Sequence, residues 1–132
     1  IEPAVNGQPY VITLETLLDV DPDYIFIDSI GLSGCVASMN GLIDDDTGLG
    51  NVSAVQNDRI YSTMVYKCYG TNWENQMINV YFVASKMNGD LYSWNFEEKA
   101  NEVIHLFYPD TTMTYSDIVD GQTGSGCGKV TL

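Results

Sequence analysis

The sequence has few basic residues and no long apolar run. It contains five lysines and arginines against eighteen aspartates and glutamates, which gives a formal net charge of −13. A surface of this charge repels phosphate backbones, so nucleic acid is excluded as a partner. No apolar stretch approaches the roughly 18 residues that a membrane-spanning helix needs. We therefore expect contact with a membrane only through an anchor outside this chain.

The motifs of common catalytic sites are also missing. The sequence has no Gly-x-Ser-x-Gly elbow, no P-loop and no His-Glu-x-x-His pattern. Its single histidine, His105, is expected beside Glu98 and Glu102 on the solvent face of a helix, and a metal site there would need further nitrogen or sulfur ligands. Asp44–Asp46 resemble part of a calcium loop but lack its distal glutamate, which favours a solvated acidic loop. The sequence thus predicts no enzymatic activity, no bound metal and no cofactor. Only the abundance of carboxylates favours a hydrolase.

The three cysteines, Cys35, Cys68 and Cys127, form no Cys-x-x-Cys pair. Because their number is odd, at least one thiol is unpaired or pairs between chains. Small buried or half-buried side chains are the expected state of free cysteines. A disulfide between two of them remains open, since an extracellular protein permits one.

The order of sequence patterns indicates one α/β domain spanning residues 1–132. The apolar run Tyr24–Ile27 predicts a central strand that is covered on both faces. Arg59–Val65 is rich in β-branched and aromatic residues and predicts a neighbouring strand. Parallel neighbours need crossover connections, so we expect a mainly parallel sheet flanked by helices. Helices are expected at 14–19, where Thr13 is the expected cap, and at 33–39, 73–87, 95–108 and 114–119. A long connection is expected at 31–50 and an edge strand at 129–132.

An aromatic loop follows the second predicted strand. Tyr66, Tyr69 and Trp73 surround Gly70-Thr71-Asn72 just before a helical pattern begins. Open α/β sheets bind ligands at the carboxyl ends of their strands. Tyrosine and tryptophan rings supply apolar contact area together with a hydrogen-bonding tip. We therefore predict that Tyr66, Tyr69, Asn72 and Trp73 contact a ligand.

Two helices have clear start signals and apolar stripes. Thr71-x-x-Glu74 predicts a capping box, and Asn95 with Glu98 predicts a similar cap. Residues at helical spacing are expected to face the core. In the first helix these are Trp73, Met77, Val80, Tyr81, Ala84 and Met87, with Trp73 the most exposed, and in the second Phe96, Ala100, Val103, Ile104 and Phe107.

Three blocks of the sequence, in order, resemble the carboxy-terminal lobe of class III solute-binding proteins. These blocks read ITLETLLDVDPDYIFIDS, AVQNDRIYSTMVYKCYGTNWEN and NFEEKANEVIHLFY, and they span most of the chain from Ile12 to Tyr108. Proteins of this family are extracytoplasmic receptors that deliver iron–siderophores, haem or vitamin B12 to ABC importers. The resemblance implies one Rossmann-like lobe of a two-lobe receptor, with the lobe's first strand and helix missing.

The resemblance also implies partners and a location. The ligand would be a metal chelate bound in the cleft between lobes, against Tyr66, Tyr69, Asn72 and Trp73. Glu74 would dock onto arginines of the ABC permease, although a purely capping role for Glu74 competes with this. The full-length protein would be extracellular or at the cell surface and anchored to the membrane. A fragment of this kind is expected to bind a chelate weakly and to self-associate. The alternative is a surface interaction module that uses the same lobe without transport.

Overall fold

The computed structural model describes residues 12–65, 70–120 and 126–132. These residues form a mixed α/β fold in which six α-helices outweigh a small sheet. The elements are α1 (Leu14–Val20), β1 (Ile25–Asp28), the 3-10 helix η2 (Ser29–Gly31), α2 (Leu32–Asp44), the 3-10 helix η3 (Leu49–Asn51), α3 (Ser53–Gln56), β2 (Ile60–Thr63), α4 (Trp73–Met87), α5 (Phe96–Phe107), α6 (Tyr115–Asp120) and β3 (Gly128–Lys129). The expected 31–50 connection is therefore largely helical, because α2 runs well beyond 33–39.

The three described strands are ordered β1-β2-β3. Strands β1 and β2 are parallel, with Ile25 opposite Ile60 and Asp28 opposite Thr63, as expected for these two neighbours. Strand β3 is antiparallel to β2, so the sheet is mixed. The prediction that Tyr24–Ile27 forms the central strand is wrong within the described sheet. Strand β2 is central because β3 pairs with its other edge.

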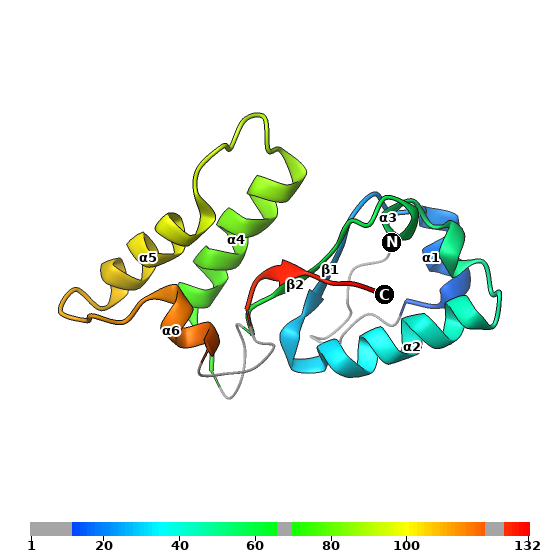
Figure 1. Cartoon of the computed structure of the whole chain (residues 1–132), viewed down its shortest axis with the longest axis horizontal. Coiled ribbons are helices and arrows are strands. Elements are labelled where there is room, and N and C mark those ends of the chain that lie inside the picture. The colour runs from blue at the N-terminus through cyan, green and yellow to red at the C-terminus, as the bar shows by residue number, and fades with distance from the viewer. Residues whose placement is uncertain (1–11, 66–69, 121–125) are drawn as a thin grey trace.

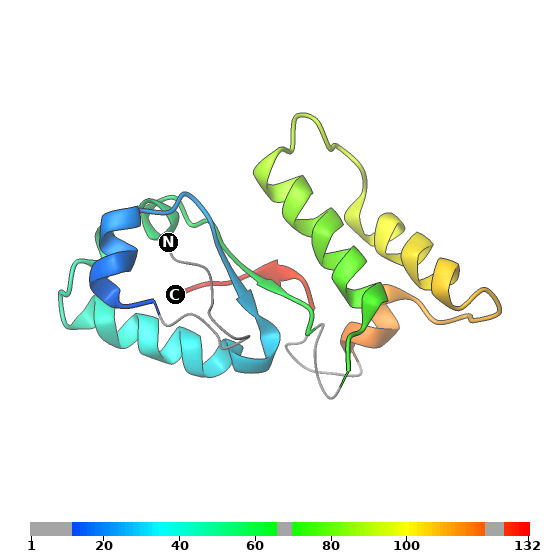
Figure 2. The ribbon, with the colours of Figure 1, turned by 180° about the vertical axis from the view of Figure 1, so that it is seen from behind.

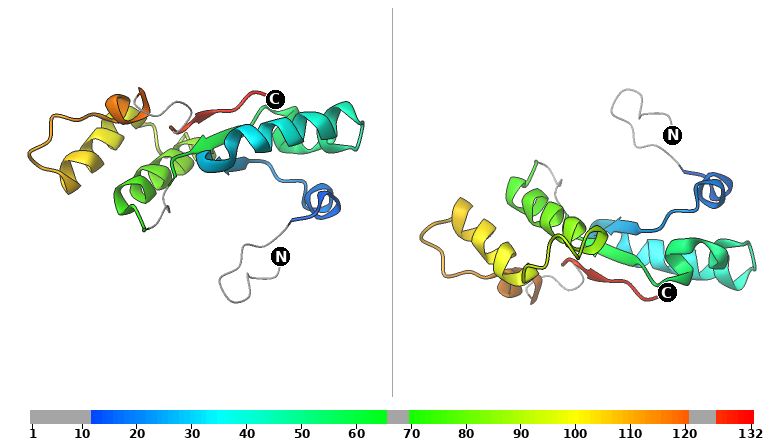
Figure 3. Two further views of the ribbon diagram at one scale, coloured as in Figure 1. Left: turned by 90° about the horizontal axis from the view of Figure 1, so that it is seen from below. Right: turned by 90° about the horizontal axis from the view of Figure 1, so that it is seen from above.

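The molecule is elongated, with two groups of helices at opposite ends (Figures 1 and 3). Helices α1–α3 lie at one end with β1, and helices α4–α6 lie at the other (Figure 2). Each group has its own buried cluster. Both clusters contain a residue from β2 or directly after it. Ile60, the first residue of β2, packs in the first cluster, and Met64, which follows β2, packs in the second. The other members are Ile27, Met39, Leu49, Val52, Ala54 and Val130 in the first, and Ile78, Ala100, Val103, Ile104 and Tyr115 in the second.

Side-chain hydrogen bonds fix the first group of helices. Thr13 caps α1 as predicted, since its hydroxyl accepts a bond from Thr16 N at 3.2 Å. The helix closes on Asp21, which has a left-handed φ of 42°. The Asp21 carboxylate then accepts bonds from Ser53 N at 2.7 Å and Ser53 Oγ at 2.9 Å. These bonds lower the pKa of Asp21 and join the end of α1 to the start of α3.

Helix α4 is rotated relative to the sequence prediction. Its buried residues are Ile78 and Phe82, 0% and 3% exposed, whereas Val80 in the predicted stripe is 62% exposed. Trp73 is exposed as expected, and Met77 and Tyr81 of the predicted stripe pack against the buried cluster. Met87 is exposed as well. The reason is that α4 packs side by side with α5, so the residues that face α5 are the ones removed from water.

The stripe of α5 was predicted more accurately. Ala100, Val103 and Ile104 are buried, and Asn95 caps the helix through bonds from Glu97 N and Glu98 N to its side-chain oxygen. Phe107 is the exception, since it is exposed in the last turn. Among the described residues, no helix is both long enough and apolar enough to cross a membrane.

Candidate functional site

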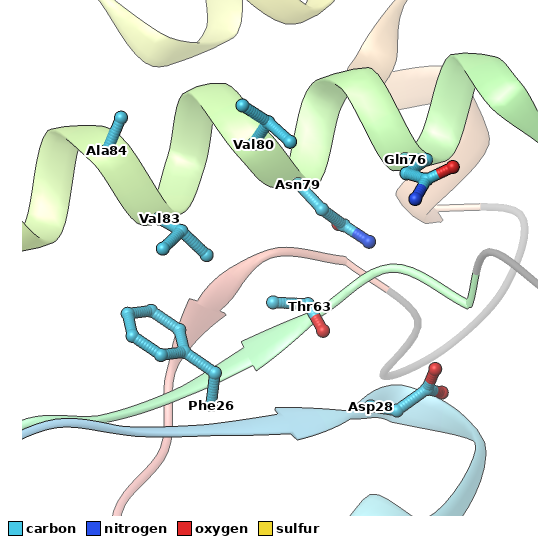
Figure 4. A pocket seen from close by; sticks show the side chains of 8 residues that line it. All are labelled: Phe26, Asp28, Thr63, Gln76, Asn79, Val80, Val83 and Ala84. Carbon is cyan, nitrogen blue, oxygen red and sulfur yellow. The ribbon is translucent and has the colours of Figure 1, made fainter. Parts of the chain in front are cut away.

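The carboxyl ends of β1 and β2 lie next to each other below the first half of α4. Asp28 ends β1, and its partner in the parallel register, Thr63, ends β2. Phe26, two residues before Asp28, points to the same face of the sheet, and α4 lies above that face (Figure 4). Side chains from two strands and one helix therefore meet at this edge of the sheet.

Two asparagines hold α4 against the end of β2. Asn79 Oδ1 accepts a bond from Met64 N at 2.9 Å, and Asn79 Nδ2 donates to Met64 O at 2.8 Å. One turn earlier, Asn75 Nδ2 donates to Val65 O at 2.7 Å. We call Asn75 and Asn79 the amide clamp. Sequence reasoning missed it, although two asparagines four residues apart on the helix after a strand were its visible signal.

An open groove of about 550 Å³ separates α4 from β1 and β2 (Figure 4). It is lined by Phe26, Asp28, Thr63, Gln76, Asn79, Val80, Val83 and Ala84. A second groove of about 440 Å³ is lined by Trp73, Gln76, Met77, Val80 and Tyr81. Since Gln76 and Val80 line both, the two grooves flank the exposed ridge of α4.

The predicted ligand residues fall partly within this region. Trp73 is the first residue of α4 and forms a wall of the second groove, with its ring largely exposed. Asn72 directly precedes it and is half-buried. Tyr66 and Tyr69 lie outside the described residues. The structure therefore places Asn72 and Trp73 side by side at the start of α4, and sequence reasoning did not find Asp28, Thr63 or Gln76.

The predicted Thr71–Glu74 capping box is wrong. Asn72, and not Thr71, occupies the N-cap position of α4, but the Asn72 side chain makes no capping hydrogen bond. Glu74 instead lies in the first turn, where its Oε1 accepts a bond from the Tyr108 hydroxyl at 3.1 Å. This bond to a carboxylate raises the pKa of Tyr108. Glu74 thus joins the start of α4 to the residue that follows α5.

The described residues contain no cluster of three or more histidine, cysteine, aspartate or glutamate side chains that could hold a metal ion. His105 is exposed, and its Nδ1 lies 2.8 Å from the backbone oxygen of Asn101 on the same helix.

Burial raises the pKa of the Cys127 thiol to about 11. A thiol with this pKa is protonated at neutral pH and a poor nucleophile.

Cys127 belongs to a packed junction between α4 and α6. Its thiol donates to Asn79 Oδ1 at 3.3 Å, and its backbone N donates to the Tyr115 hydroxyl at 2.7 Å. Burial also raises the pKa of Tyr115. Cys35 is a free, half-buried cysteine, whereas Cys68 lies outside the described residues. The bonds of Cys127 therefore give it a packing role in this junction.

No protein-family model matches this chain, and neither does any curated protein.

Proposed function

We propose that this chain is a solute-binding lobe of an extracytoplasmic receptor that delivers an iron or cobalt chelate to an ABC importer. The observation that carries the proposal is the exposed Trp73 ring beside Asn72 at the start of α4. Its groove adjoins, through Gln76 and Val80, the groove at the carboxyl ends of the parallel pair β1 and β2. Ligands bind near the carboxyl ends of the strands in open α/β folds. In this proposal the described strands belong to a mainly parallel, Rossmann-like sheet of a two-lobe protein.

The chemistry of the site suits a large planar or aryl-bearing chelate. Trp73, with Tyr66 and Tyr69 from the preceding loop, would supply ring faces to a siderophore, haem or corrinoid, and Asn72 would supply a polar contact. A second lobe would close over the ligand and remove it from water, as most small-molecule sites do. The full-length receptor would lie outside the cell or at its surface, anchored to the membrane by a segment outside this chain.

Removing the Trp73 ring should weaken chelate binding. In the intact receptor we expect Trp73→Ala to raise the dissociation constant about fivefold or more, because central aromatic contacts are often worth more than about 1 kcal/mol. Calorimetric titration with a ferric trihydroxamate, a ferric tricatecholate, haem and cobalamin measures this effect.

The matched control is Tyr92→Ala, which removes a partly exposed ring in the connection between α4 and α5. It should leave the affinity unchanged. An unchanged affinity in Trp73→Ala, for every chelate that binds the unmodified receptor, would remove Trp73 from the site.

Glu74 is the proposed contact with the permease. It lies next to the ligand-binding residues, and its bond to Tyr108 holds the carboxylate in place. We expect Glu74→Lys in the full-length receptor to abolish uptake of an iron-55 chelate while chelate affinity is retained, because like charges would then meet at the permease.

Two further variants separate charge from structure. Glu74→Gln keeps an acceptor for Tyr108 and removes only the charge, so it should also impair uptake. Glu98→Lys reverses an exposed charge on α5 and should transport normally. Normal uptake by Glu74→Lys would mean that Glu74 only tethers α4 to Tyr108.

A surface interaction module is the second candidate function. The observation that favours it is a row of exposed apolar side chains at seven-residue spacing along α4, namely Trp73, Val80 and Met87. Such rows often mark protein interaction sites. The titrations above separate the two candidates, because a module without transport would bind none of the chelates.

A further inference from the structure

The groove between α4 and the β1–β2 pair has two chemically different ends (Figure 4). Phe26, Val83 and Ala84 form an apolar end. Asp28 and Gln76 lie at the other end, beyond Thr63. A ligand that fills this groove must therefore have an apolar body and a polar head.

The wall of the apolar end is held in place by a row of aromatic rings. Phe26 stacks against Tyr24, with ring centres 6.3 Å apart, and against Tyr61 at 5.6 Å. Tyr61 in turn meets Phe82 edge-on at 5.9 Å. The Lys86 ammonium lies 5.7 Å from the centre of the Tyr61 ring and 5.2 Å from that of Phe82. The apolar end of the groove is thus bordered by packed aromatic rings, and the positive charge of Lys86 lies beside these rings.

The polar end is rich in hydrogen-bond acceptors. Asp28 Oδ1 accepts a bond from Ile30 N at 2.9 Å, and Asp28 Oδ2 has no hydrogen bond within the part of the chain that the structure describes. The Thr63 hydroxyl donates to Ile27 O at 3.5 Å, so its own lone pairs remain available. Gln76 Oε1 is buried and has no partner among the described residues. A buried atom of this kind is closed to a ligand in the groove, so the open acceptors at this end are the Asp28 carboxylate and the Thr63 hydroxyl.

We propose that this groove binds a small amphipathic organic ammonium. The ammonium head, with its donors and positive charge, lies against the acceptors of Asp28 and Thr63, and the hydrocarbon body lies along Phe26 and Val83. Lys86 at the far end repels the cationic head and so fixes this orientation. The net charge of −13 attracts cations and disfavours anionic ligands.

The size of the groove agrees with this class of ligand, since small-molecule sites usually measure about 300–1,000 Å³. This inference does not depend on the chelate proposal. It uses Asp28 and Thr63, whereas the chelate site uses Asn72, Trp73 and the preceding loop.

The test is a titration of the 132-residue chain with hexylammonium chloride, followed by nitrogen–proton correlation spectra. We expect saturable shifts confined to β1, β2 and α4. Asp28→Asn keeps an acceptor for Ile30 N and removes the charge, so binding should weaken about tenfold. Asp23→Asn removes an equal charge from an exposed position outside the groove and should bind as the unmodified chain does.

Three further measurements test separately how the ammonium head and the hydrocarbon tail of the ligand contribute to binding. 1-Hexanol, which has the tail alone, and methylammonium, which has the head alone, should each bind at least about tenfold more weakly than hexylammonium. Val83→Trp places a ring in the apolar end, because Val83 points toward Phe26 (Figure 4), and it should block hexylammonium, whatever happens to the folding of Asp28→Asn. The inference is overturned if hexylammonium causes no saturable shifts at millimolar concentration, if 1-hexanol binds as tightly, or if a folded Val83→Trp binds hexylammonium normally.

Discussion

Replacing Ile78 with alanine is expected to destabilise the chain by about 2–5 kcal/mol, because the substitution leaves a cavity in a fully buried cluster. Ile78 lies on α4, is 0% exposed, and packs in the cluster that α4 forms with α5 and α6. Val80, on the same helix but 62% exposed, provides the matched control. We expect Val80→Ala to change the free energy of unfolding by less than about 0.5 kcal/mol.

Urea denaturation of the two purified variants measures both values. The comparison also tests the rotation of α4 directly, since the sequence prediction placed Val80 in the buried stripe and left Ile78 out. A larger loss of stability in Val80→Ala than in Ile78→Ala would mean that α4 packs through its Trp73–Val80 face.

The second large effect is expected at the amide clamp. Asn79→Leu removes both hydrogen bonds to Met64 and leaves a buried N–H and a buried C=O without partners. Each such group costs about 1–3 kcal/mol, so the total loss of stability from the two groups should be about 2–6 kcal/mol. It should be accompanied by faster hydrogen exchange at the Met64 amide, because that N–H loses its acceptor.

Asn88→Leu is the control, since Asn88 is an exposed residue at the end of α4. Its stability and the exchange rate of Met64 should match the unmodified chain. Equal denaturation midpoints for Asn79→Leu and Asn88→Leu would show that the clamp does not hold α4 against β2.

Local signals in the sequence predicted the local structure well. Thr13 and Asn95 cap their helices because their side-chain oxygens follow simple spacing rules. The adjacency of the strands at Ile25 and Ile60 followed from their patterns and from the crossover between them. These features depend on neighbours in sequence or on one connection, so the sequence alone was enough.

Features decided by distant packing were predicted less well. Helix α4 has apolar residues on more than one face, and only its contact with α5 selects Ile78 and Phe82 over Val80. Strand β3 has only two residues, too few for a periodic signal, yet it makes β2 the central strand. The capping error arose because Thr71 and Asn72 are both good cap residues, and their spacing to Glu74 differs by a single position.

The candidate site shows the same division. Asn72 and Trp73 were found because the aromatic loop precedes a helix in sequence. Asp28 and Gln76 are far apart in sequence, and only the fold brings them to one groove. No pattern around either residue distinguishes it from other surface carboxylates and amides, so sequence reasoning could not pair them.

The central claim is that a metal chelate binds against Trp73. Its most direct test follows the two tryptophan indole N–H signals of the nitrogen-15-labelled chain, assigned with Trp73→Phe, during titration with diamagnetic chelates. Suitable probes are a gallium trihydroxamate, a gallium tricatecholate and cobalamin. Trp94, which packs against Tyr81 and Tyr92, serves as the internal reference. We expect at least one chelate to move the Trp73 signal to saturation while the Trp94 signal stays in place. A Trp73 signal that is unmoved by every chelate, or movement of the Trp94 signal alone, would contradict the claim.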